Sequence, residues 1–143
     1  MLDPSFYDKA TLPGLLKHWS DTTPDRLAFR EKDFGIWERM TFRDYYEKTK
    51  DFAYGLIALG VKAVAGENTP EWMYSDLAMQ ALGGACIGIY PTNPWVELRY
   101  ILDHSGSSIA VCGDQEQTDK VFDAIEKGGA LPNLRKIICV DMG

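Results

Sequence analysis

The stretch Glu67–Thr92 (ENTPEWMYSDLAMQALGGACIGIYPT) decides the fold, because it contains in order the signals for a helix, a Gly-Gly turn, an apolar strand and a Pro-containing exit. Asn68 or Thr69 can cap the helix through a short side-chain oxygen, and Pro70 suits the first helical position. Ala85–Tyr90 (ACIGIY) is apolar without polar alternation, a pattern typical of a strand covered on both faces. We therefore predict a parallel α/β unit with this strand at its centre.

The helix of this stretch is expected to be buried, because apolar side chains dominate its second half. Gly83 and Gly84 end the helix, and Pro91 and Pro94 favour an extended exit from the strand. The apolar positions of the helix are Leu77, Ala78, Met79, Ala81 and Leu82.

The rest of the chain alternates between helical and strand patterns. This order predicts a three-layer α/β fold with a mostly parallel, doubly wound sheet and an N-terminal β-hairpin. The expected helices are Leu12–Ser20, Phe42–Leu59, Asn93–His104 and Gln115–Lys127, the further strands are Val61–Gly66, Ser108–Cys112 and Lys136–Val140, and the hairpin joins Leu27–Glu31 to Ile36–Thr41. Core-facing helix positions include Leu56 and Ile57 in the long helix, and Val121, Phe122 and Ile125 in the last one.

Local signals also define several element ends. Thr41 can cap the long helix through its side-chain oxygen. Gly60 and Gly106 stand where a left-handed residue would close a helix. Gly35 supplies the backbone freedom that the hairpin turn needs.

Composition excludes several classes of function. The chain of 143 residues has a net charge of −6, which disfavours nucleic acid as a partner. No apolar run approaches the about 20 residues that span a bilayer. The N-terminus lacks a basic start and an apolar signal core, so we expect a cytoplasmic protein.

Cys86, Cys112 and Cys139 lie in apolar, strand-like runs and are expected to be buried, reduced thiols. His18 and His104 are the only histidines, and neither stands at a metal-ligand spacing or near a nucleophile. No metal-binding residue is assigned.

Few residues are candidates for chemistry. The glycines of the central stretch do not form GxGxxG, and GxxxxGK[ST] is absent; a helix stop explains Gly83 and Gly84. Asp76 and Gln80 lie one turn apart and are expected to form a polar strip that meets another part of the protein, rather than an acid/base pair. No catalytic or cofactor-binding residue is assigned.

The loop Tyr90–Pro94 is the best functional candidate. It follows the C-terminal end of a parallel strand, where open α/β sheets place their ligands. We therefore predict that Tyr90, Pro91 and Thr92 contact substrate.

Motifs of a known family occur in four segments: Thr11–Leu27 (TLPGLLKHWSDTTPDRL), Met40–Tyr46 (MTFRDYY), Glu67–Trp72 (ENTPEW) and Leu82–Thr92 (LGGACIGIYPT). Together these segments resemble the N-terminal part of the AMP-forming acyl-CoA synthetases, within the acyl-adenylate-forming superfamily. The IYPT form and the following ELRYILDHSGSSIAV are most similar to the long-chain fatty acyl branch. The likeness covers nearly the whole chain, so residues 1–143 are interpreted as part of one N-terminal AMP-binding domain.

The resemblance implies a parent enzyme that joins a fatty acid to coenzyme A through an acyl-adenylate, using ATP and Mg²⁺ and releasing AMP and pyrophosphate. The phosphate-binding loop of the type TSGTTGxPKG and the lysine of the small C-terminal domain do not occur in this sequence. The chain alone is therefore expected to be inactive, with ATP, Mg²⁺ and coenzyme A implied only for the parent. Val61–Gly66 is also shorter than the family's usual segment, so this strand is expected either to pair poorly or to have lost part of its length.

Two alternatives remain open. The chain could be a non-catalytic remnant or regulatory module that binds acyl chains or a partner subunit. It could also be a general nucleotide-binding Rossmann protein, although the missing glycine fingerprint argues against this. Self-association through uncovered apolar surface is a further expectation, as is peripheral membrane association of the parent.

Overall fold

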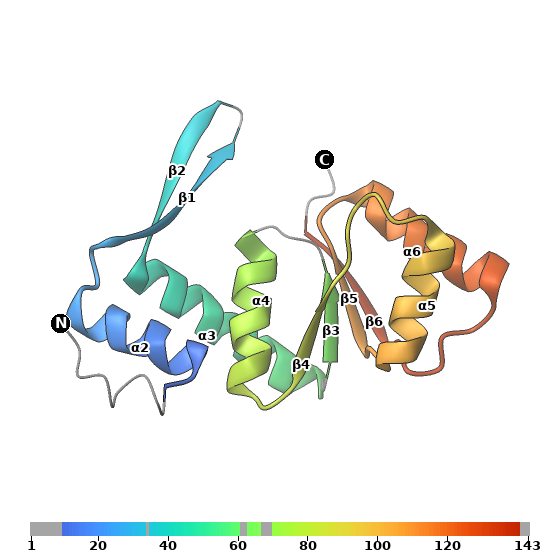
Figure 1. The fold of residues 1–143 in the computed structure, drawn as a ribbon, viewed down its shortest axis with the longest axis horizontal. Coiled ribbons are helices and arrows are strands. Elements are labelled where there is room, and N and C mark those ends of the chain that lie inside the picture. The colour runs from blue at the N-terminus through green and yellow to red at the C-terminus, as the bar shows by residue number, and fades with distance from the viewer. Residues whose placement is uncertain (1–9, 34, 61–62, 67–69, 141–143) are drawn as a thin grey trace.

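The computed structural model describes residues 10–33, 35–60, 63–66 and 70–140. Figure 1 shows helices on both sides of a parallel sheet, with a separate hairpin projecting from one end. Two expected helix caps, Asn68 and Thr69, lie outside the described residues. The first two residues of an expected strand, Val61 and Lys62, also lie outside them. The elements are α2 (Leu12–Thr22), β1 (Leu27–Asp33), β2 (Ile36–Thr41), α3 (Phe42–Leu59), β3 (Ala63–Gly66), α4 (Pro70–Ala81), β4 (Ala85–Gly88), α5 (Trp95–Ser105), β5 (Ile109–Cys112), α6 (Gln115–Gly128) and β6 (Lys136–Cys139).

The parallel sheet has the strand order β4-β3-β5-β6, and β1 pairs with β2 in an antiparallel hairpin. Alternate residues of β5 face opposite layers. Ile109 and Val111 pack with side chains of α3 and α4, whereas Ala110 and Cys112 pack with side chains of α5 and α6. The three-layer, doubly wound α/β fold with an N-terminal hairpin is therefore confirmed (Figure 1).

The position of β4 corrects one prediction. β4 is an edge strand, and Ala85 and Gly88 at its ends are exposed. The crossover through α4 places β4 on one side of β3, and the crossover through α5 returns past β3 to β5. The strand covered on both faces is instead β5, all four residues of which are buried. Apolar composition indicated a strand correctly, but it carries no information about strand order.

Strand β3, which lies in the short segment Val61–Gly66, also differs from expectation. β3 pairs with β4 over Ala63–Gly66 and with β5 over Val64–Gly66, so it is an interior strand of the sheet. Four residues are enough, because β4, β5 and β6 have the same length. Of the two alternatives for this segment, poor pairing is therefore contradicted, and the loss of part of its length stays untested.

Ile57 and Phe122 are exposed, although both were expected to face the core. Each directly follows a residue that is 1% exposed, Leu56 and Val121. Successive helix positions point in different directions, so only one member of each pair faces the sheet. Ala81, the last residue of α4, and Leu82 directly after it are likewise exposed, although both were expected to be buried.

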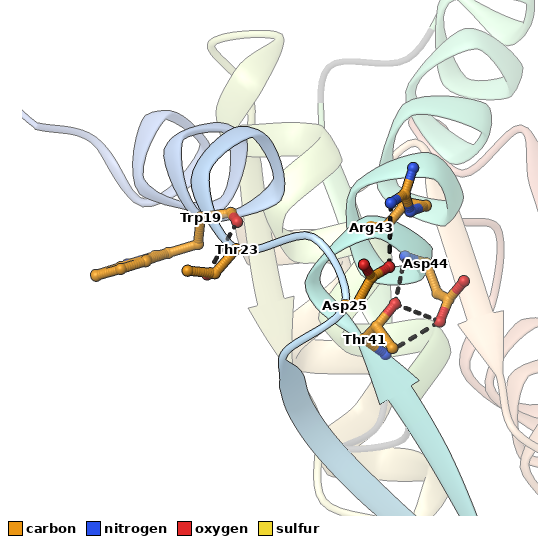
Figure 2. Close-up of polar contacts among 6 residues, drawn as sticks. All are labelled: Trp19, Thr23, Asp25, Thr41, Arg43 and Asp44. Atoms are coloured by element: carbon orange, nitrogen blue, oxygen red, sulfur yellow. Dashed lines mark hydrogen bonds and ion pairs between the residues drawn. The ribbon is translucent and has the colours of Figure 1, made fainter.

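Side-chain hydrogen bonds fix the junction between the hairpin and α3 (Figure 2). The Thr41 hydroxyl accepts a hydrogen bond from the Asp44 amide at 3.2 Å, and the Asp44 carboxylate accepts one from the Thr41 amide at 3.1 Å, forming a capping box. The hydrogen bond from the Thr41 hydroxyl holds the pKa of Asp44 below its usual value. Arg43 donates to Asp25 at 3.0 Å across the same junction, and Thr23 donates to the Trp19 carbonyl at the end of α2 (Figure 2).

Candidate functional site

The candidate site lies at the carboxyl ends of β3, β4 and β5. The chain leaves β3 toward β4 on one side, and β5 occupies the other side of β3. This reversal makes the carboxyl ends of β3 and β5 the topological switch point, where open α/β sheets bind their ligands. The Tyr90–Thr92 turn follows β4 and reaches this edge.

Backbone hydrogen bonds hold the turn at both ends. The Ile89 amide donates to the Gly66 carbonyl at 2.8 Å, which extends the pairing of β3 with β4 by one residue. The Asn93 amide donates to the Tyr90 carbonyl at 3.0 Å and closes the turn. Tyr90 is 78% exposed, and Pro91 and Thr92 are exposed beside it. The three predicted contact residues therefore lie together at the surface.

The side chain of Lys120, on α6, also anchors the Tyr90–Thr92 turn. Its ammonium group donates to the Pro91 carbonyl at 2.6 Å and to the Gln117 amide oxygen at 3.2 Å. It also forms an ion pair with Glu116 at 3.0 Å. Sequence analysis missed Lys120, because only its spacing from Glu116 is visible in the sequence and Pro91 is 29 residues away.

A cleft of about 270 Å³ opens beside the turn. It is lined by Trp72, Gly88, Ile89, Tyr90 and Pro91. The Trp72 ring, from the first turn of α4, lies against Gly88, where an added Cβ would meet Trp72 Cζ2 at 3.6 Å. The volume is just below the about 300–1,000 Å³ of typical small-molecule sites, so the cleft suits part of a ligand. In the sequence, Trp72 is notable only as the last residue of the family-like segment Glu67–Trp72, and its place in the cleft was not predicted.

A smaller cavity of about 20 Å³ lies between the ends of β3 and β5 and helices α5 and α6. That space is about the size that holds one water molecule. Gly66, Cys112 and Gln117 are among its lining residues, and Gln117 is only 8% exposed. The cavity is mostly apolar, and Gln117 and Tyr90 are the residues with polar side-chain groups among those that line it, beside the Cys112 thiol.

The cleft is built for binding contacts. The phenol of Tyr90 is the one ionisable side chain among its lining residues. Cys86, on the neighbouring strand β4, does not supply a reactive thiol, because burial and the Asp76 charge raise its pKa to about 12. The geometry therefore offers aromatic surface and backbone groups rather than acid/base chemistry.

The other candidates have structural partners away from the cleft. The Gln80 amide donates to the Asp76 carboxylate at 3.0 and 3.1 Å, so these two side chains pair with each other on α4. His18 lies edge-on to Trp19, and His104 stacks on Tyr100.

Gly83 ends a helix as expected. It has a φ of 72°, as a left-handed residue at a helix end requires. Of the cysteines, which were expected to be buried, Cys112 is buried, and Cys86 and Cys139 are half-buried. Among the described residues, none of the three cysteines forms a disulfide.

Within the described ranges, no cluster of three or more His, Cys, Asp or Glu side chains could hold a metal ion. Over the same part of the chain, no helix is both long and apolar enough to cross a bilayer. A cytoplasmic location stays a prediction.

Comparison with protein families decides the wider assignment. The family model described as AMP-binding enzyme matches residues 16–143. The chain belongs to the AMP-binding enzyme family. Because the match runs from α2 to the C-terminus, it includes the Tyr90–Thr92 turn, Trp72 and Lys120.

Individual relatives give a finer comparison. The long-chain-fatty-acid–CoA ligase ACSBG2 of Xenopus laevis is 30% identical over 141 residues, which cover 92% of this chain and 19% of that protein. The uncharacterized protein Rv1549 of Mycobacterium tuberculosis is 30% identical over 123 residues, which cover 82% of this chain and 65% of that protein. The chain therefore spans about a fifth of the ligase and about two thirds of Rv1549.

Solved structures support the fold. The N-terminal domain of FACL13 from Mycobacterium tuberculosis superposes with a TM-score of 0.83 at 20% identity, covering 92% of this chain and 34% of that one. The chain thus resembles the N-terminal domain of long-chain fatty acid–CoA ligases.

Proposed function

We propose that this chain is the N-terminal part of a long-chain fatty acid–CoA ligase and supplies scaffold and one substrate-contact surface to it. The match of residues 16–143 to the AMP-binding family carries this proposal, and the named ligase relative gives the substrate class. The complete ligase would convert fatty acid, ATP and coenzyme A to acyl-CoA, AMP and pyrophosphate, with Mg²⁺ bound to the nucleotide. We assign ATP, Mg²⁺ and coenzyme A to no residue of this chain.

Within that ligase, we assign substrate contact to Tyr90, Pro91 and Thr92. The cleft beside them presents the Tyr90 and Trp72 rings, which favours an apolar or planar part of a substrate. Lys120 fixes the Pro91 carbonyl, so the turn would not have to become ordered when a ligand binds. Less ordering on binding leaves more of the contact energy for affinity.

Alone, the chain is proposed to be catalytically inactive. Adenylation develops charge on phosphate oxygens, which must be stabilised by donors, cations or a metal. The loop TSGTTGxPKG that would supply such donors does not occur in the 143 residues. Fatty-acid-dependent exchange between ATP and pyrophosphate, measured on the purified chain, is expected at background level. Exchange clearly above background would refute the proposal of inactivity.

A second candidate function is a non-catalytic binding module. Rv1549 supports it, because this chain covers 65% of that protein, whereas it covers 19% of the Xenopus ligase. Titration calorimetry with acyl-CoA and with ATP separates the two. Saturable binding by the isolated chain favours a module, and no binding favours a part that needs the rest of a ligase.

We also propose that the isolated chain self-associates through one apolar face. Leu59 and Val140 are exposed, and Leu59 lines a groove of about 490 Å³ between α3, α4 and β6. Large apolar patches on a soluble surface commonly mark contact sites. Sedimentation velocity over a range of concentrations tests this, and a monomer at every concentration would contradict it.

A further inference from the structure

The β1–β2 hairpin projects beyond the helices and the parallel sheet (Figure 1). Its base is held by the body of the molecule, because the Phe29 ring contacts Tyr45 of α3 with ring centroids 5.2 Å apart. Farther out, Ile36 is 66% exposed and Trp37 is 58% exposed, and we call these two residues the hairpin tip. A two-stranded hairpin is at best marginally stable on its own and gains stability from a further surface to pack on. The hairpin tip is therefore suited to contact with another surface.

The strand register places the two apolar side chains of the tip on opposite faces of the hairpin. In an antiparallel pair, residues directly opposite each other share a face, and neighbours along a strand alternate between faces. Trp37 lies opposite Lys32, and Ile36 lies opposite Asp33, so each face carries one of the two exposed side chains. A flat surface would cover only one face, whereas a groove covers both at once.

Charge adds a second requirement for the surface that receives the tip. Arg30 lies opposite Arg39, on the same face as Trp37. Both arginines are exposed, and neither forms an ion pair with a carboxylate of the described residues. Like charges directly opposite each other destabilise a strand pair, so carboxylates beside the arginines would stabilise the hairpin. The tip therefore matches a groove with apolar walls and acidic groups.

The groove of about 490 Å³ between α3, α4 and β6 has this composition. Asp51 and Glu71 line it, and neither forms an ion pair with a cation of the described part of the chain. Lys48 lines it as well, and its ammonium group lies 5.7 Å from the centroid of the Tyr74 ring. The volume lies within the about 300–1,000 Å³ that suits a well-defined binding pocket. Its apolar wall residues are Phe52, Leu56, Leu59 and Ile138.

We propose that the hairpin tip of one copy of this chain docks in the α3–α4–β6 groove of a second copy. The tip lies far from the groove of its own copy, because the hairpin extends away from the end of α3 that carries the groove (Figure 1). Each copy has one tip and one groove, and a reciprocal exchange of the two gives a closed two-fold dimer. The inference rests on the self-association proposed above and names the surface that fills the groove.

Charge complementarity favours a second copy as the occupant. The chain has a net charge of −6, so two copies repel each other overall. Docking of the tip brings Arg30 and Arg39 of one copy toward Asp51 and Glu71 of the other, which offsets this repulsion at the contact. Trp37 supplies the large aromatic side chain that commonly dominates the binding energy of a protein interface.

Sedimentation equilibrium of the full 143-residue chain tests the proposal with two matched pairs of variants. Trp37→Ala should weaken the dimer by roughly 30-fold or more, as expected for a tryptophan at the centre of an interface. Tyr100→Ala removes a ring that is 65% exposed on α5 and should change the dimer by less than about 3-fold. Leu59→Ser, in the groove, should also weaken the dimer. Its control Val96→Ser, at an exposed apolar residue of α5, should not.

A mixture of two weakened variants gives the sharpest test. Trp37→Ala chains keep an intact groove, and Leu59→Ser chains keep an intact tip, so one tip-to-groove contact can form between them. The mixture should therefore contain heterodimers that are tighter than the dimers of either variant alone, measured with one variant fluorescently labelled. Circular dichroism checks that each variant is folded. If Trp37→Ala does not fold, Arg39→Gln replaces it, with an expected weakening of up to about 5-fold.

Three results would overturn the proposal. A monomer at every concentration would remove both this contact and the self-association. A dimer that Leu59→Ser weakens and Trp37→Ala leaves unchanged would keep the self-association and exclude the tip from it. A mixture without tighter heterodimers would show that identical faces meet. The ligase proposal is tested separately, by exchange between ATP and pyrophosphate, so its failure is distinguishable from each of these.

Discussion

Gly66 and Gly88 face each other in the β3–β4 pair, and the Trp72 ring lies near both. An alanine at each position nevertheless meets different surroundings. At Gly66 the added Cβ would be 2.9 Å from the Val111 backbone oxygen and 3.3 Å from Trp72 Cε3. At Gly88 its nearest neighbour would be Trp72 Cζ2 at 3.6 Å, an ordinary contact. The two substitutions therefore form a matched pair that separates a steric clash from a general effect of alanine.

The expected magnitudes follow from two opposing effects. Replacing glycine by alanine restricts the unfolded chain and stabilises a protein by about 0.4–1 kcal/mol where the native backbone tolerates it. Overpacking a filled site costs about 1–3 kcal/mol, and a backbone oxygen in a paired strand cannot move aside as a side chain can. Gly66→Ala should therefore lower the free energy of unfolding by about 1–2 kcal/mol. Gly88→Ala should leave it within about 0.5 kcal/mol or raise it slightly.

Urea unfolding followed by far-ultraviolet circular dichroism measures both variants. Tryptophan fluorescence is less suitable, because Trp72 itself lies beside the substituted positions. A lower midpoint with an unchanged slope would report a change in stability rather than in the surface exposed on unfolding. Equal losses in both variants, or a stabilised Gly66→Ala chain, would refute the packing argument.

Three further predictions concern single side chains. Arg39→Glu places an opposite charge across from Arg30 and should raise the free energy of unfolding by about 0.2–1 kcal/mol, measured by urea unfolding; a loss of stability would contradict the repulsion. Lys120→Met removes the hydrogen bond to the Pro91 carbonyl and should speed amide exchange in the turn, measured by mass spectrometry; unchanged exchange would mean that the turn needs no anchor. Because burial raises the pKa of Cys86 from 9.0 to about 12, the unfolded chain loses this thiol proton first, so stability should fall as the pH rises above about 9; Cys86→Ala should show a shallower fall over the same range, and an identical pH profile would refute the assignment.

Element ends were predictable because their signals are local. Gly60 and Gly106 have φ angles of 65° and 63° and close α3 and α5, as expected. Thr41 caps α3 within four residues of chain. In each case the interacting groups are near neighbours in sequence, so propensity and hydrogen-bonding capacity are sufficient to identify them.

Strand order and burial were less predictable because they depend on distant segments. The run Ala85–Tyr90 was expected at the centre of the sheet, yet β4 is an edge strand and β5 is fully buried. Both runs are apolar, and the difference comes only from the direction of the crossover through α5. Helix periodicity likewise placed Phe122 inward with Val121, although the sheet covers only the Val121 side of α6.

The candidate site depends both on local sequence signals and on contacts between distant segments. The Tyr90–Thr92 turn was predictable from its place after a parallel strand, but its anchoring was not, since Gly66, Asn93 and Lys120 come from three different parts of the chain. These contacts restrain backbone groups and leave the Tyr90 side chain exposed.

A restrained backbone with an exposed aromatic ring suits recognition, because little conformational entropy is lost when a ligand binds. It does not suit proton transfer, which needs an ionisable group with a pKa near the working pH. Among the described residues that line the cleft, only the Tyr90 side chain is ionisable. The geometry of this region therefore supports the proposed role in substrate contact rather than a role in proton transfer.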